Sequence, residues 1–199
     1  MEVPLVEGAT RDPELTSHRV QMSGYGKVLV TRKSGEKVRL ALSALLDQRR
    51  EPMVLELDFA GVAIVDYSFA DEVIVRVLVN ALAKSYGEKY LVLLGLNPDL
   101  EENVAVSLQQ RGYGLLVQDD GRWQVIGNCK DHLLQALEMI NQRGCITARD
   151  LADDQELAIN TASNRLMDLY RAGLAYRSER ILPGGGKQFA YSSLLRRDV

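Results

Sequence analysis

The chain has 199 residues, enough for one ordinary domain or two small ones. Hydrophobic residues make up 46% and charged residues 26%, a balance that excludes a disordered chain. The net charge is −3, so any binding to nucleic acid or a membrane surface needs a local basic patch. Two cysteines and two histidines are too few for a disulfide framework or an ordinary zinc site, and we expect no metal and no cofactor.

Residues 1–25 carry prolines and scattered charges with no clear period, and we assign them to an N-terminal arm that lies outside the α/β domain. The start of the chain lacks a basic region followed by an apolar core, so we expect no secretory signal. The longest apolar stretch, 73–82, is too short to span a membrane and is interrupted by Arg76 and Asn80. We therefore expect a soluble cytoplasmic protein that does not bind membranes.

Residues 26–127 alternate between β-like runs and helical periods, which predicts an α/β layer domain. Ser34 and Ser68 are the expected N-caps of the first two helices, and Pro98 is the expected first residue of the third. The expected strands are 27–31, 53–58 and 90–96, the expected helices are 34–49, 68–86 and 98–111, and a hairpin joins 115–118 to 122–126. The nearly continuous apolar run at 90–96 is typical of a central strand covered on both faces.

Residues 128–199 follow a different order, with three helices and then two β-like runs. Thr147 and Asp150 form a capping pattern for the second helix, and Asn160 is the expected N-cap of the third. The expected helices are 131–141, 148–156 and 161–172, and the expected strands are 174–180 and 187–192.

This second region resembles the winged helix-turn-helix domains of bacterial transcription regulators. The resemblance rests on the stretch ITARDLA at 146–152 and on NTASNRLMDLYRAGL at 160–174, with an "LA" pair in the second helix and "AGL" after the third. It implies that the third helix reads the major groove while the wing contacts phosphates. The expected DNA-binding residues are Thr161, Ser163, Asn164, Arg165, Arg177, Arg180 and Lys187.

The charge of this region also favours an alternative. From Cys129 onward there are 10 basic and 9 acidic residues, a net of +1. Several of the acidic residues lie in or near the helices expected to read DNA and would repel phosphates. A winged helix of this kind can dock protein instead of DNA, because fold alone does not determine function. If it does bind DNA, we expect binding to need a homodimer or a low-salt buffer.

The first region resembles the STAS fold of anti-sigma-factor antagonists, and most closely a STAS-like bacterial offshoot. The resemblance rests on LELDFAGVAIVDYSFADE at 55–72 and on YLVLLGLNPDLEENV at 90–104. In the classical antagonists, a serine at the start of a helix is phosphorylated by a partner kinase that is also an anti-sigma factor. Matching on Asp66 puts Tyr67 at the acceptor position, with Ser68 after it and Phe69 in place of the usual glycine.

Asp66, Tyr67 and Ser68 are therefore the expected partner-binding or regulatory loop, and the resemblance implies a regulatory partner such as a kinase-like ATPase. The residues also allow a purely structural interpretation. Ser68 can be an N-cap whose capping box is completed by Asp71, Asp66 can be a turn residue, and Phe69 is expected in the core.

The two resemblances together predict a STAS-like α/β sheet domain followed by a small winged helix-turn-helix domain, which acts as a regulator of transcription. The alternative is a protein–protein adaptor in a partner-switching pathway. No Ser, His and Asp group or phosphate loop suggests catalysis, so we expect no enzyme. A nucleotide-hydrolysing or transferase activity with an unfamiliar site is a third reading.

Overall fold

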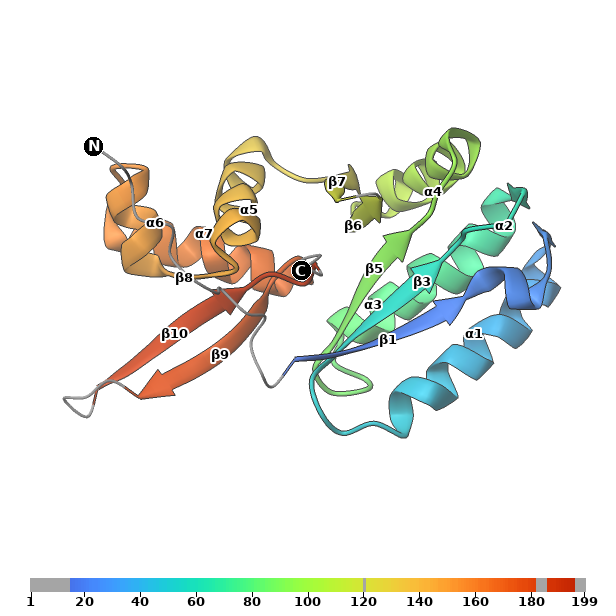
Figure 1. The fold of residues 1–199 in the computed structure, drawn as a ribbon, viewed down its shortest axis with the longest axis horizontal. Helices are drawn as coiled ribbons and strands as arrows, with labels where there is room; N and C mark the ends of the chain where they lie inside the picture. The colour runs from blue at the N-terminus through green and yellow to red at the C-terminus, as the bar shows by residue number, and fades with distance from the viewer. Residues whose placement is uncertain (1–14, 120, 182–185, 196–199) are drawn as a thin grey trace.

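A computed structural model describes residues 15–119, 121–181 and 186–195 (Figure 1). The first part of the chain supplies seven strands and four α-helices. Their bounds are β1 (Thr16–Gln21), β2 (Val28–Leu29), α1 (Arg32–Asp47), β3 (Met53–Asp58), β4 (Ile64–Val65), α2 (Tyr67–Ala70), α3 (Arg76–Leu82), β5 (Lys89–Leu94), α4 (Pro98–Arg111), β6 (Gly114–Asp119) and β7 (Arg122–Gly127). A short 3-10 helix, η1 (Met22–Tyr25), follows β1, and a π-helical segment, η2 (Asp71–Val75), joins α2 to α3.

Five of these strands form one sheet in the order β1-β3-β5-β6-β7. The first four are parallel, and β7 pairs antiparallel with β6 through the hairpin that the sequence predicts. All six residues of β5 are buried, which confirms the prediction of a central strand covered on both faces. The chain is thus a mixed α/β protein with a mainly parallel central sheet.

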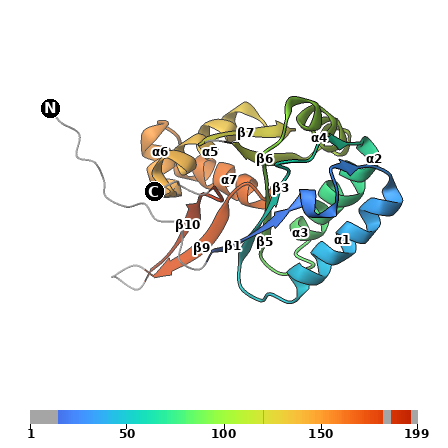
Figure 2. The same cartoon turned by 45° about the vertical axis from the view of Figure 1, so that its right-hand side comes forward.

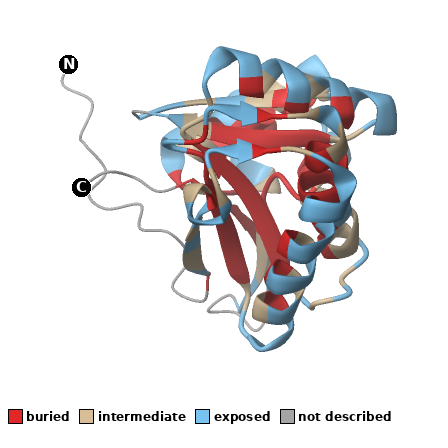
Figure 3. Cartoon of the chain, turned by 90° about the vertical axis from the view of Figure 1, so that its right-hand side faces the viewer, coloured by how far each residue is buried: buried red, intermediate tan, exposed pale blue. Residues whose placement is uncertain are grey.

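The two faces of this sheet belong to two hydrophobic clusters. Leu55, Leu57 and Leu91 pack with the helices α1, α3 and α4 on one face. Val54 and Val92 face the other way, into a cluster formed with helices and strands from the C-terminal part of the chain. Figure 2 shows these two layers on opposite sides of the sheet, and Figure 3 shows the buried strands between helices that expose their outer surfaces.

The C-terminal part contains α5 (Asp131–Arg143), β8 (Cys145–Thr147), α6 (Ala148–Asp154), α7 (Ile159–Arg171), β9 (Tyr176–Ile181) and β10 (Lys187–Ser192). Its strands form an antiparallel sheet in the order β8-β10-β9. Leu166 and Leu169 of α7 are buried in one cluster with Leu137 and Leu151, as the sequence predicts. Thr147 and Asp150 make the predicted capping box at the start of α6.

Several expected boundaries are wrong. The expected arm contains β1, because residues 16–21 pair with β3 along its whole length, while residues 1–14 lie outside the described part. The expected strand at 27–31 is reduced to β2, which pairs with β4 and not with the central sheet.

Three of the four expected N-caps also differ from the structure. Thr31, not Ser34, caps α1, and Asp66, not Ser68, caps α2. The third helix of the C-terminal part begins at Ile159, so Asn160 lies inside it and Ala158 takes the N-cap position without a side-chain bond. In α1 and α2 the backbone enters the helix earlier because a polar side chain upstream accepts the free N–H groups. No helix among the described residues is long and apolar enough to cross a membrane.

Candidate functional site

The start of α2 is organised by the carboxylate of Asp66. Its Oδ1 accepts the backbone N–H of Phe69 at 2.7 Å, and its Oδ2 accepts the backbone N–H of Thr31 at 3.0 Å. Thr31 in turn caps α1, with its side chain accepting the backbone N–H of Ser34. One carboxylate therefore ties together the starts of two helices, where N–H groups would otherwise lack partners.

The next two residues of the predicted loop differ in their surroundings. Tyr67 is 36% exposed, and its hydroxyl donates to Oε1 of Gln110 on α4 at 2.6 Å. Ser68 is half-buried in the first turn of α2. Asp66, Tyr67 and Ser68 thus lie at one helix start, with Asp66 in a structural role and Tyr67 presented to solvent.

A cavity of about 380 Å³ lies beside these helix starts. Its lining residues include the exposed Tyr25 and Val28, the two lysines Lys33 and Lys37, and the buried Phe69. Ile64, paired with Val28 in the small parallel ribbon, is 52% exposed. Apolar surface beside cations is typical of protein-binding surfaces, because aromatic and aliphatic groups supply burial and charges supply orientation.

Two buried carboxylates follow the loop on the π-helical segment. Asp71 forms ion pairs with Arg32 and Arg111, at N···O distances of 3.1 and 2.9 Å. Glu72 forms ion pairs with three arginines, namely Arg32 at 3.3 Å, Arg39 at 2.9 Å and Arg76 at 3.2 Å. Both carboxylates are nearly inaccessible, so this network joins α1, α4 and the segment η2. The sequence carries one signal of it, two acidic residues directly before the apolar run at 73–75.

On α7, the residues predicted to contact DNA spread over an exposed surface and its edge. Thr161 and Asn164 are exposed, whereas Ser163 and Arg165 are half-buried. Nη1 of Arg165 donates to Oε1 of Gln155 at 3.0 Å. Of these four predicted residues, the two exposed ones both lie in the N-terminal half of α7.

The basic residues predicted on the strands all have partners. Arg180 donates to Sγ of Cys145 at 3.0 Å, and Lys187 pairs with Glu179 at 2.7 Å, both at exposed positions. Arg177 is half-buried, with its guanidinium 4.8 Å from the ring centre of Tyr170 and 4.3 Å from that of Phe189. Arg180 and Lys187 are open to solvent, while Arg177 is held against two aromatic rings.

A polar cluster that sequence reasoning missed lies where the two parts meet. Glu88, next to β5, accepts hydrogen bonds from Nζ of Lys84 at 2.7 Å, the hydroxyl of Tyr90 at 2.7 Å and the hydroxyl of Tyr170 at 2.8 Å. Burial opposes the ionisation of Glu88, but these three donors together lower its pKa. Burial, reinforced by the Glu88 carboxylate, raises the pKa of the Tyr90 and Tyr170 hydroxyls, which keeps them as donors.

Comparison with known proteins adds no identification, since no protein-family model and no curated protein sequence matches the chain. Within the described residues, no group of three or more His, Cys, Asp or Glu side chains is arranged to hold a metal ion.

Proposed function

We propose that this chain is a bacterial cytoplasmic transcription regulator, in which a STAS-like sheet domain, extending from β1 to residue 127, receives a signal and a winged helix-turn-helix at 128–199 binds DNA. One observation carries the proposal. The elements follow one another as expected for a winged helix, in the order α5, β8, α6, α7, β9 and β10, with the strands arranged β8-β10-β9. In the proposed arrangement, α7 is the recognition helix and β9–β10 form the wing.

The side chains of α7 support DNA contact by this helix. Ala162, Leu166 and Leu169 are committed to the core, which leaves Thr161 and Asn164 in solvent at the end that recognition helices insert into the major groove. Arg180 and Lys187 on the proposed wing are both exposed, so their side chains can reach phosphates by leaving their present partners, Cys145 and Glu179. Arg165 would have to leave Gln155 to reach a base.

In the sheet domain, the proposed partner surface is the start of α2 with the neighbouring cavity. Tyr67 and the apolar pair Val28 and Ile64 are exposed there, beside Lys33 and Lys37. The proposed partner is a regulatory protein, such as a kinase-like ATPase. The proposal contains no catalytic step and no cofactor.

A second candidate is a protein–protein adaptor whose winged helix docks protein. The observation in its favour is the charge of the C-terminal part, only +1 from Cys129 onward, together with the ion pair that occupies Lys187. Weak net charge lowers the non-specific affinity on which DNA searching depends.

DNA selection from genomic fragments in low-salt buffer separates the two candidates. We expect an enriched fragment whose binding weakens by about 1–3 kcal/mol in Asn164→Ala or Arg165→Ala, with relaxed sequence preference. Arg180→Ala and Lys187→Ala should weaken all sequences alike and lower the salt slope by about one unit each.

Arg122→Ala is the matched control, because this exposed arginine lies on the β6–β7 hairpin. Its substitution should change neither the free energy of DNA binding nor the salt slope. A folded, concentrated sample that enriches no fragment would leave the adaptor as the better candidate.

A further inference from the structure

The junction between the sheet and the C-terminal part contains a continuous series of cations and aromatic rings. Nζ of Lys84 lies 4.5 Å from the ring centre of Tyr170, and the guanidinium of Arg177 lies 4.8 Å from the same centre. That guanidinium also lies 4.3 Å from the ring centre of Phe189 on β10. The series therefore runs from the turn before β5, through α7, to both strands of the wing.

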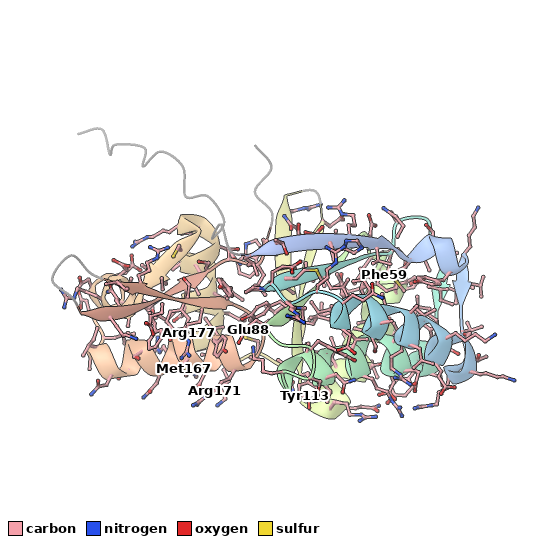
Figure 4. The ribbon with its side chains drawn as sticks, turned by 90° about the horizontal axis from the view of Figure 1, so that it is seen from below. Phe59, Glu88, Tyr113, Met167, Arg171 and Arg177 are labelled. Carbon is pink, nitrogen blue, oxygen red and sulfur yellow. The ribbon has the colours of Figure 1, made fainter. Side chains whose placement is uncertain are left out.

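Glu88 anchors this series on the sheet side. Its two carboxylate oxygens accept three hydrogen bonds, and the one from the Tyr170 hydroxyl crosses between the two parts of the chain. Figure 4 shows Glu88 at the junction of the two parts, on the side where Arg177 lies. Hydrogen bonds to a carboxylate are stronger than those between neutral groups, so this contact is directional as well as favourable.

Two further contacts hold the same junction. The rings of Tyr90 and Tyr176 meet edge to face, with centres 6.0 Å apart and planes at 85°. Gly173, directly after α7, lies so close to Leu82 that an added Cβ would come within 2.8 Å of Cδ2. The end of α7 and the start of β9 are therefore both fixed against the sheet domain.

We infer that Glu88 and Lys84 are positioning residues for the wing, which act through Tyr170 and Arg177 and contact no DNA themselves. The inference rests on the proposed DNA-binding function and deepens it. It also gives Arg177 a different role from the phosphate contact expected from sequence, because its guanidinium is engaged by Tyr170 and Phe189.

The position of this cluster in the chain connects it to the proposed partner surface. The segments α2, η2 and α3 follow one another without a break from Tyr67 to Leu82, and Lys84 comes two residues later. The continuous helical segment that Asp66 caps thus ends at the turn that carries Lys84 and Glu88. A displacement of this helix along its axis would move the anchor of the wing.

The test uses the full-length chain with Glu88→Ala, Tyr170→Phe and the double variant, and it measures amide hydrogen exchange in β9 and β10. Tyr170→Phe removes only the hydroxyl and keeps the ring for Lys84 and Arg177. We expect each single variant to exchange about tenfold faster in the wing, the factor typical of one lost charge-assisted hydrogen bond. The double variant should exchange no faster than Glu88→Ala alone, because Glu88→Ala already removes the bond that Tyr170→Phe removes.

Conservative and unrelated changes serve as controls. Glu88→Gln retains a carbonyl acceptor and should restore part of the protection that Glu88→Ala loses. Glu102→Gln, at an exposed position of α4, should leave exchange in the wing unchanged. Far-UV circular dichroism checks that each variant is folded, and Glu88→Gln remains available if Glu88→Ala unfolds.

DNA binding supplies the second measurement. On any fragment that the wild type binds, Glu88→Ala should weaken binding without changing the salt slope, since no phosphate contact is lost. Unchanged wing exchange, or a double variant that multiplies the two single effects, would overturn the positioning role. Faster exchange in a protein that binds no DNA would keep that role and reject the DNA-binding function, so the two failures are distinguishable.

Discussion

Asp66 accepts the backbone N–H of Thr31 across 35 residues of sequence, with the same carboxylate that caps α2. Thr31 has a φ of 71°, in the region that non-glycine residues rarely adopt. The hydrogen bond from its N–H to Asp66 is one of the interactions that hold this conformation. The start of α1 therefore depends on a residue of the loop that precedes α2.

This relationship predicts that Asp66→Ala is more destabilising than Ser68→Ala. Loss of an N-cap costs about 0.5–2 kcal/mol, and Asp66 serves two helix starts, so we expect a value near the upper end. Ser68→Ala should change the free energy of unfolding by less than about 0.5 kcal/mol. Urea denaturation of both variants measures the difference, and equal losses would restore Ser68 as the cap.

Glu88 predicts a specific dependence of stability on pH. Because its pKa is lowered in the folded protein, its stabilising contribution is complete above the ordinary carboxyl pKa of 4.5 and is lost as the pH falls through the folded value. Wild type should therefore be more stable than Glu88→Gln at pH 7, and the difference should shrink below pH 4.5. A difference in stability between wild type and Glu88→Gln that stays constant from pH 7 to below pH 4.5 would mean that Glu88 is not ionised in the cluster.

The hydrophobic cluster that joins the central sheet to the C-terminal part predicts that the two parts of the chain unfold together. Leu137 of α5 is fully buried in this cluster with Val92 of the sheet, so Leu137→Ala should cost about 2–5 kcal/mol. Trp123 packs against the same cluster and reports on it by fluorescence. Fluorescence and circular dichroism should give one coincident transition in wild type and variant. Two separated transitions would show that the parts are independent domains.

Gly173 and Gly112 form a matched pair for testing the contact with Leu82. Both have left-handed φ values, 71° and 75°, but an added Cβ meets Leu82 at Gly173 and nothing within 4 Å at Gly112. Gly112→Ala should cost about 1–2 kcal/mol from backbone strain alone. Gly173→Ala should lower the free energy of unfolding further, by the energy needed to displace the Leu82 side chain. Thermal unfolding compares them, and equal costs would mean that Leu82 moves freely.

Elements with a strong local pattern were predictable from the sequence. The apolar run of β5, Pro98 at the start of α4 and the capping box at Thr147 all lie as expected, because each depends on residues close in sequence. The fully buried positions of Phe59 and Phe69 also follow the expectation for aromatic residues.

The remaining features depend on partners far along the chain. β1 has polar side chains at five of its six positions, and one of them, Arg19, pairs with the buried Glu56 of β3, which no pattern within β1 indicates. The cluster around Glu88 likewise joins residues 82 positions apart. The spacing of apolar residues along the sequence indicates which face of a helix or strand is buried, but it does not indicate which distant element covers that face.

The burial of β5 on both faces has a consequence for how this sequence can diverge. Leu91 and Leu93 contribute to the cluster of the first helices, whereas Val92 contributes to the cluster of α5 and α7. Substitutions at Val92 should therefore covary with those at Leu137 or Leu169, and substitutions at Leu91 with those in α1 or α3. The C-terminal part of this chain could therefore be replaced by that of a diverged homologue only together with the residues of β5 that face it, such as Val92. The alternating residues that face the first helices, such as Leu91, would stay unchanged.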